Sequence, residues 1–275
     1  MGRASVNTIR ERYNNGTPLS MLTAYDAEIA RLVDAGGVDM VLVGDSAADN
    51  HHGYADTLSL TVEEALSNTA AVVRGVEEAF VVADLPFLAY GTDEAESIRN
   101  AGRFLKEARA DAVKLETPPN GDTSITLIER LTELGIPVQG HIGFTPQRNR
   151  ALGGAVVQGR GNARSASADA LVATAERLEA AGVFSIVVEA VTEASAKRIT
   201  EAVDVPTIGI GAGRYVDGQV LVINDVIGLG EADYTLSKQY ADVGDTIRNA
   251  VASYVNDVEE GTFPTAAHSF DPMDE

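Results

Sequence analysis

Four short apolar runs in this chain each lead to an acidic residue, and helix-length segments separate them. The acidic residues are Asp45, Asp84, Glu116 and Glu189. A carboxylate at the end of a buried strand is unfavourable unless it meets a metal, a cation or water. Parallel strands joined by helices bring their carboxyl ends to one rim, where (β/α)8 barrels build their active sites. The pattern therefore predicts an enzyme with this fold.

Apolar runs and amphipathic segments alternate along the chain, as they do in βα units. Predicted strands end near Ala24, Val43, Ala83, Leu115, Gly140, Val188, Gly209 and Val222. Predicted helices span Asp26–Ala35, Thr61–Gly75, Thr92–Ala108, Ser124–Leu134, Ala166–Ala181, Thr192–Val203 and Ser237–Val255. Eight strands form a closed barrel or a long doubly wound sheet. The first strand lacks the Gly-x-Gly-x-x-Gly turn of dinucleotide-binding sheets, which favours the barrel.

The length of 275 residues suits one barrel of about 250 residues, although two smaller domains would also fit. We expect a single domain over 1–275. Residues 1–18 would form an N-terminal cap with a short helix around Thr8–Asn14, and 257–275 a C-terminal tail. Two long loops, 45–60 and 141–165, follow the second and fifth strands, where such loops form lids or substrate walls.

The charge balance is strongly acidic, with 41 Asp and Glu against 21 Lys and Arg and a net charge of −20. This excess argues against nucleic acid as a partner, since phosphate binding needs basic patches. It is typical of a salt-adapted surface. No apolar run is long enough to span a membrane, and the N-terminus has no secretory signal pattern. There is no cysteine, so we expect a cytoplasmic protein without disulfides.

Lysine is rare in this chain, and one lysine lies in an unexpected place. Three of the four lysines fall in or near predicted helices, whereas Lys114 lies inside an apolar strand just before Leu115 and Glu116. Burial penalises a lysine, so its presence there indicates a role at the site. The alternative is a structural ion pair with a neighbouring acid.

Asp45, Asp84 and Glu116 come from three consecutive strand ends. Three carboxylates with water in the remaining positions suit Mg²⁺, which prefers oxygen ligands and keeps part of its hydration shell. Each acid could instead cap the helix that follows its strand.

Glu189 and His141 are the candidate acid–base residues. Glu189 has apolar neighbours, which raise the proton affinity of a carboxylate and suit a general base near neutral pH. The alternative is an ion pair with an arginine of the long loop, such as Arg148, Arg150 or Arg160. His141 lies at a strand end and could polarise a substrate oxygen.

Two further motifs are weaker. His51 and His52 are adjacent in a loop and lack a third ligand, so solvated loop residues are the simpler interpretation. The glycine-rich turn 209–213 is similar to a phosphate-binding turn, but close backbone packing would select the same glycines.

Together these segments resemble the ketopantoate (3-methyl-2-oxobutanoate) hydroxymethyltransferase family. The resemblance covers about residues 5–265. It is carried by segments 21–26, 41–46, 83–87, 113–116, 140–147, 156–160, 208–213 and 217–222. It implies a barrel of the phosphoenolpyruvate mutase/isocitrate lyase type. The acidic, lysine-poor composition points to a haloarchaeal member.

The resemblance also implies a reaction. The enzyme would transfer a hydroxymethyl group from 5,10-methylenetetrahydrofolate to 3-methyl-2-oxobutanoate through a Mg²⁺-stabilised enolate, giving 2-dehydropantoate for coenzyme A synthesis. It implies a homo-oligomer, often a decamer. The implied roles are metal binding by Asp45, Asp84 and Glu116, keto-acid binding by Asp45, Ser46, Asp84, Lys114 and His141, and base catalysis by Glu189.

Three segments depart from the family's usual pattern, namely 47–52, 117–119 and 155–156. These departures affect the expected lid and leave the metal and base positions unchanged.

Two rival functions remain. One is a lyase or mutase of the same superfamily, which the absence of cysteine disfavours because the lyases compared use a loop cysteine as acid. The other is a non-catalytic barrel that binds a keto acid.

Overall fold

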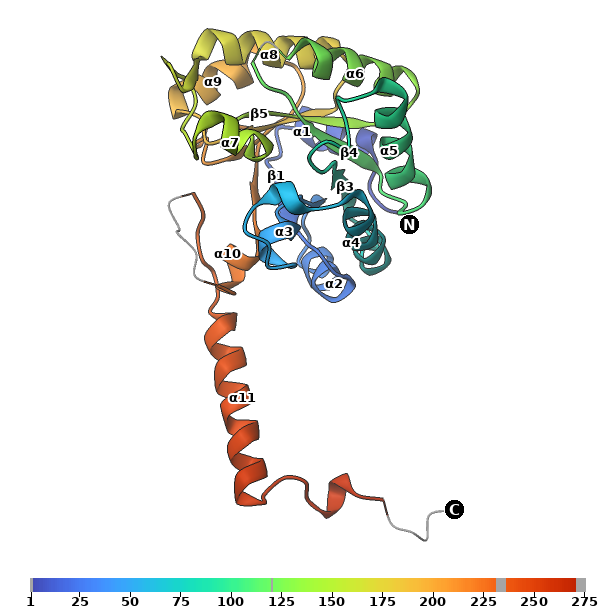
Figure 1. The fold of residues 1–275 in the computed structure, drawn as a ribbon, viewed down its shortest axis with the longest axis vertical. Coiled ribbons are helices and arrows are strands. Elements are labelled where there is room, and N and C mark those ends of the chain that lie inside the picture. The colour runs from blue at the N-terminus through green and yellow to red at the C-terminus, as the bar shows by residue number, and fades with distance from the viewer. Residues whose placement is uncertain (1, 120, 231–235, 271–275) are drawn as a thin grey trace. The chain divides into compact units, whose positions relative to one another are not determined.

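The computed structural model describes residues 2–119, 121–230 and 236–270, and its central feature is a closed barrel of parallel strands (Figure 1). The strands are β1 (Leu19–Thr23), β2 (Met40–Val43), β3 (Phe80–Asp84), β4 (Ala112–Glu116), β5 (Val138–Gly143), β8 (Ser185–Glu189), β9 (Thr207–Ile210) and β10 (Gly218–Leu221). They pair in the order β1-β10-β9-β8-β5-β4-β3-β2, which closes on itself. All eight predicted strands are confirmed. Seven end within one residue of the expected position, and β5 ends three residues later than expected, at Gly143 rather than Gly140.

Helices on the outside of the barrel connect successive strands (Figure 1). They are α2 (Ala27–Ala35), α4 (Val62–Gly75), α5 (Glu94–Lys106), α6 (Asp122–Glu133), α8 (Ala168–Ala180) and α9 (Glu193–Ala202). A capping box of Thr61 and Glu64 is present at the start of α4. Helix α5 begins two residues after the predicted start at Thr92, because the Asp93 carboxylate caps it by accepting a hydrogen bond from the amide of Glu96.

Helix α1 (Val6–Asn14) covers the amino ends of the strands, as the predicted N-terminal cap requires. Its Ile9 is 1% exposed and belongs to the apolar cluster inside the barrel. The cluster also contains Leu19, Met40 and Phe80, the first residues of their strands. Apolar side chains thus fill the amino-terminal end of the barrel, and the polar groups gather at the other end.

The two long loops contain short elements that periodicity did not reveal. The loop after β2 holds α3 (Ala47–Asn50) and the 3-10 turn η1 (Thr57–Ser59). The loop after β5 holds η2 (Pro146–Arg148), α7 (Asn149–Leu152) and an antiparallel hairpin of β6 (Arg160–Asn162) and β7 (Ser165–Ser167). Elements of three or four residues are too short to show a repeat.

Contacts divide the chain into a unit of Met1–Ile223 and a second of Asn224–Glu275. Helix α10 (Ile223–Ile227) lies at the junction, and the second unit contains α11 (Val243–Glu260) and η3 (Ala266–His268). The helix predicted over Ser237–Val255 was wrong in its bounds, because Asp242 caps α11 through the amide of Asp245. Helix α11 also continues into residues 257–260, assigned above to the tail. A single domain stays a prediction.

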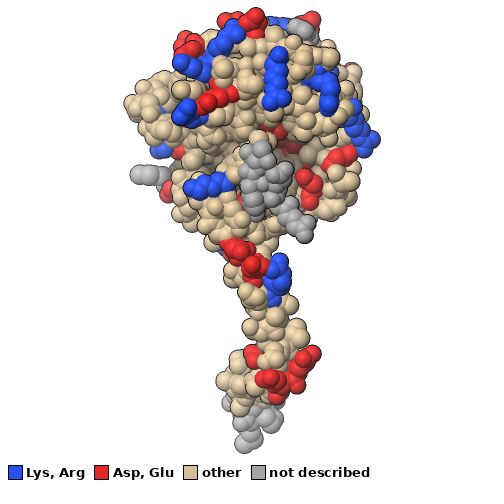
Figure 2. Space-filling model, turned by 90° about the vertical axis from the view of Figure 1, so that its left-hand side faces the viewer, with Lys and Arg blue, Asp and Glu red and all other residues tan. Residues whose placement is uncertain are grey.

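Lys and Arg side chains lie among Asp and Glu side chains on the face of the barrel drawn in Figure 2. Several exposed arginines pair with acids, including Arg103 with Glu63 and Arg198 with Asp169. Exposed pairs of this kind contribute roughly 0–1 kcal/mol each. No helix in the described part of the chain is long and apolar enough to cross a membrane, and the cytoplasmic location stays a prediction.

Candidate active site

A small cavity of about 120 Å³ opens at the carboxyl ends of the barrel strands. Six of the seven predicted site residues line it: Asp45, Ser46, Asp84, Lys114, His141 and Glu189. Glu116 lies beside it and lines an adjoining outer groove of about 390 Å³. Drug-sized ligands occupy pockets of about 300–1,000 Å³, so the inner cavity suits only a small molecule. The chemical roles of these residues stay predictions.

Lys114 and Asp84 form a buried ion pair at the centre of the site. Strands β3 and β4 place the two residues directly opposite each other. The Lys114 Nζ donates a hydrogen bond to Asp84 Oδ2 at 2.5 Å, and both side chains are at most 5% exposed. The acids around Lys114, with Asp84 first, outweigh its burial and raise its pKa. Lys114 is therefore a fixed cation, and the ion pair considered as its alternative explanation is present.

Asp45, Asp84 and Glu116 are all buried, and burial is the largest cause of the raised pKa of each carboxyl. Asp45 reaches a pKa of about 7, with Asp84 as a further cause. None of the three caps the α-helix that follows its strand, because Asp93 caps α5 and the N-caps of α3 and α6 are Ser46 and Gly121. The capping alternative therefore does not account for them.

The three carboxylates fit a hydrated divalent cation. Asp84 Oδ1 is buried and has no hydrogen-bond partner among the described residues, so an acceptor is left for a ligand. No three His, Asp or Glu side chains in the described ranges converge closely enough to enclose an ion alone. Mg²⁺ keeps several waters and needs only one or two direct carboxylates. A cation here would also relieve the repulsion between the acids.

Glu189 ends β8, and its carboxylate faces His141 rather than an arginine. Its Oε2 lies 3.2 Å from His141 Nε2, and burial raises its pKa to about 7. Burial also lowers the pKa of His141 well below its usual range, so this imidazole is neutral. Of the arginines considered as partners, Arg150 pairs with Asp56 instead. Ala190, the next residue, has a φ of 46°, a strained conformation of the kind found at functional sites.

Ser46 and the histidine pair complete the predicted residues. The Ser46 hydroxyl is 2.9 Å from the Tyr25 hydroxyl and shares a hydrogen bond with it. His52 Nε2 is 2.9 Å from the amide of Asn68, and its ring is edge-on to His51. His51 is exposed, as predicted for a solvated loop residue, whereas His52 is half-buried.

Sequence reasoning missed the buried Gln147, which touches two of the carboxylates, and the half-buried Tyr90, which hydrogen-bonds to it. The Gln147 side-chain amide donates to Asp45 Oδ2 at 3.0 Å, and its main-chain amide donates to Glu116 Oε2 at 3.2 Å. The Tyr90 hydroxyl donates to Gln147 Oε1 at 2.9 Å. Both residues lie in loops without periodicity. The only signal was that Gln147 belongs to one of the segments that carry the family resemblance.

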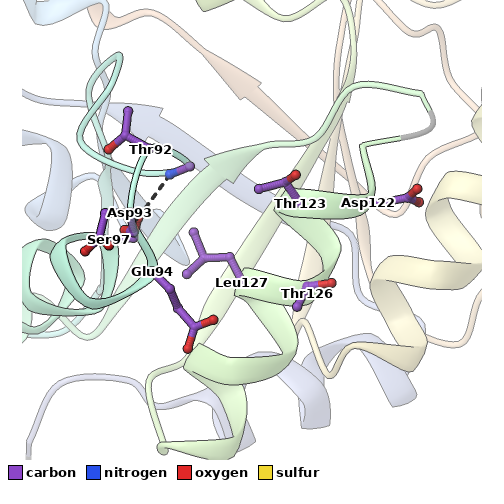
Figure 3. Close-up of a pocket in the computed structure, with 9 residues that line it drawn as sticks. Thr92, Asp93, Glu94, Ser97, Asp122, Thr123, Thr126 and Leu127 are labelled. Carbon is purple, nitrogen blue, oxygen red and sulfur yellow. Dashed lines mark hydrogen bonds between the residues drawn. The ribbon is translucent and has the colours of Figure 1, made fainter.

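Another cavity, of about 340 Å³, lies between the amino ends of α5 and α6 and contains none of the predicted residues (Figure 3). Thr92, Asp93 and Ser97 face Thr123 and Leu127 across it. Two of its three acids are already engaged, because Asp93 caps α5 and Asp122 pairs with Arg177.

The chain matches the family described as ketopantoate hydroxymethyltransferase over residues 3–266. A 3-methyl-2-oxobutanoate hydroxymethyltransferase of Halobacterium salinarum is 51% identical over 268 residues, covering 96% of each chain. The enzyme of the same name from Pseudothermotoga lettingae is 50% identical and covers 92% of this chain and 94% of its own. Haloarchaeal sequences are therefore among the similar relatives.

Solved structures with the same fold are much more distant in sequence. The phosphoenolpyruvate phosphomutase of Streptomyces platensis subsp. rosaceus superimposes with a TM-score of 0.63 at 14% identity, over 98% of this chain and 92% of its own. A 2,3-dimethylmalate lyase, a member of the PEP mutase/isocitrate lyase superfamily, superimposes with a TM-score of 0.60 at 15% identity, over 98% of this chain and 89% of its own. The predicted fold class is confirmed. The match to the family model and the relatives of about 50% identity show that this chain belongs to the ketopantoate hydroxymethyltransferase family of transferase enzymes.

Proposed function

We propose that the chain transfers a hydroxymethyl group from 5,10-methylenetetrahydrofolate to 3-methyl-2-oxobutanoate, giving 2-dehydropantoate. The names of its relatives support this substrate. The observation that carries the proposal is the juxtaposition of a fixed cation, buried carboxylates and a carboxylate with a pKa of about 7 around one small cavity. This combination suits removal of a proton next to a keto group.

Asp45, Asp84 and Glu116 would hold Mg²⁺, in part through water. When bound, Mg²⁺ supplies Lewis-acid stabilisation of the negative charge that develops on the keto oxygen. The unpartnered Asp84 Oδ1 and the mutual repulsion of these acids support this assignment. Asp45, Ser46, Asp84, Lys114 and His141 would contact the keto acid.

Glu189 would accept the proton from C3 of the keto acid. A general base is most effective when its pKa lies near the working pH, and burial brings the pKa of Glu189 to about 7. His141 is neutral, and its Nε2 lies 3.2 Å from Glu189 but has no hydrogen-bond partner among the described residues, so this imidazole can donate to a substrate oxygen. Lys114 places its positive charge next to the cavity, where it stabilises negative charge on the substrate.

The C3 carbanion then attacks the methylene carbon of the folate, and one of the two C–N bonds of the methylene bridge breaks. The proton held by Glu189 goes to the released nitrogen. A water oxygen replaces the second nitrogen on this carbon and becomes the hydroxyl group, a water proton goes to that nitrogen, and tetrahydrofolate leaves. The outer groove beside Glu116 is larger than the inner cavity and gives room for the folate.

We also propose that the chain self-associates through α11. Ile247, Val251, Tyr254 and Val258 lie three or four residues apart along this helix and are all at least 48% exposed. One apolar face of the helix is therefore not covered by its own unit, Asn224–Glu275, and a second copy of the chain is the partner that would bury it. Light scattering of the wild type should give a multiple of 28.9 kDa, and Val251→Asp should lower it.

The deciding experiment is proton NMR of 3-methyl-2-oxobutanoate in D₂O with the protein, Mg²⁺ and molar KCl, without folate. Metal-dependent loss of the C3 proton signal would support enolisation of this keto acid. Glu189→Gln should bind the keto acid but not exchange the proton. A persistent signal from folded protein, with or without added folate, would refute the proposal and favour a lyase or a binding protein.

A further inference from the structure

The carboxylates at the end of the barrel are joined by a directed chain of hydrogen bonds through Tyr90 and Gln147. The main-chain N–H of Glu116 donates to the Tyr90 hydroxyl oxygen at 3.1 Å. The Tyr90 hydroxyl donates to Gln147 Oε1 at 2.9 Å. The Gln147 Nε2 donates to Asp45 Oδ2 at 3.0 Å and to the carbonyl of Leu85 at 2.9 Å.

Every direction in this chain is forced. A main-chain N–H can only donate, so the Tyr90 hydroxyl accepts from Glu116 and must use its own proton toward Gln147. The carbonyl of Leu85 can only accept, so the nitrogen end of the Gln147 amide faces Leu85 and Asp45. The amide of Gln147 therefore has both protons and its oxygen engaged, and it cannot flip without losing these bonds.

Gln147 also reaches a second carboxylate through its backbone. Its main-chain N–H lies 3.2 Å from Glu116 Oε2 and 3.3 Å from Glu116 Oε1. Gln147 is 6% exposed, and Asp45 and Glu116 are 5% and 4% exposed. One residue of η2 thus touches two carboxylates that come from different strands, 102 and 31 residues away in the chain.

We propose that Gln147, oriented by Tyr90, is the positioning residue that fixes Asp45 and Glu116 for a divalent cation. This inference rests on the metal site of the proposed function. Groups that hydrogen-bond to metal ligands fix their orientation, and their removal typically weakens metal binding about 10–100-fold. The amide also holds the Asp45 oxygen on the side of η2, which leaves the other oxygen of Asp45 for the metal or its waters.

The chain offers a matched control in Gln158, a second buried glutamine of the same long loop. Gln158 is 3% exposed, and its side chain also makes three hydrogen bonds. Its partners are all main-chain groups: the carbonyls of Val156 and Arg164 and the amide of Ala166. Gln147→Met and Gln158→Met therefore remove the same chemistry, and only the first removes a contact with a carboxylate.

The test is a titration of the metal-free full-length protein with Mn²⁺, with free Mn²⁺ followed by electron paramagnetic resonance. Gln147→Met should raise the Kd about 10–100-fold, and Gln158→Met should leave it unchanged. Tyr90→Phe removes one oxygen atom and should raise the Kd in the same direction. In the double variant Tyr90→Phe/Gln147→Met the increase in Kd should be smaller than the product of the two single increases, because Tyr90 orients Gln147.

Wild-type Kd values in Gln147→Met, or equal losses in Gln147→Met and Gln158→Met, would overturn the inference and leave the metal site standing. Absence of Mn²⁺ binding by the wild type would overturn the metal site as well. Thermal unfolding without metal checks each variant. If Gln147→Met does not fold, the result for Tyr90→Phe decides, and a wild-type Kd there overturns the inference.

Discussion

Replacement of Lys114 by methionine should destabilise the protein far more than replacement of any surface lysine. Met keeps most of the volume of the side chain but removes the charge that faces Asp84 at 2.5 Å. The attraction between two unit charges at this distance is about 7 kcal/mol at an effective dielectric constant of about 20. The desolvation of both groups offsets part of it, so removal of one partner from a buried pair costs about 3–5 kcal/mol.

Urea unfolding at pH 7 in metal-free buffer, at fixed protein concentration, measures this loss. With a slope of about 3 kcal/mol per molar urea, the midpoint of Lys114→Met should fall by about 1–2 M. The double variant Lys114→Met/Asp84→Asn also removes the uncompensated charge of Asp84, so it should recover much of the lost free energy of unfolding. Lys197→Met is the surface control, because Lys197 is 50% exposed and lies 3.6 Å from Glu201. A shift of Lys114→Met no larger than that of Lys197→Met, or no recovery in the double variant, would refute the reasoning.

Three further outcomes are expected. The rate of C3 exchange should fall about tenfold per pH unit below pH 7 and level off above it, because the base must be deprotonated and the pKa of Glu189 is about 7. A rate profile centred near pH 4.5 would contradict this. Gly143→Ala should abolish exchange, because the added Cβ would lie 2.2 Å from the carbonyl oxygen of Glu189. Gly37→Ala is the control and should stay active, because Gly37 has a similar positive φ and no atom lies within 4 Å of the added Cβ. The melting temperature should fall on transfer from about 1 M to about 0.01 M KCl, because a net charge of −20 is then screened over about 30 Å rather than about 3 Å.

The structure confirms most of the architecture expected from the sequence, since strand and helix periods are local properties. The alternation of apolar runs located all eight strands, and the acids at their ends located the rim that carries the site. The failures have local causes as well. The hairpin of β6 and β7 is too short to show a period, and the start of α11 is set by the Asp242 cap rather than by the pattern of apolar residues.

The sequence by itself determined which residues would reach the rim, because the end of a parallel strand defines both the place and the direction of its last side chain. Only the tertiary structure decided how those residues interact. Lys114 meets Asp84 because β3 and β4 pair in one register, and Glu189 faces His141 rather than an arginine because β5 and β8 are neighbours. Tyr90 and Gln147 were not predicted, since hydrogen bonds depend on the distance and direction between loops far apart in the chain, and periodicity carries no information about either.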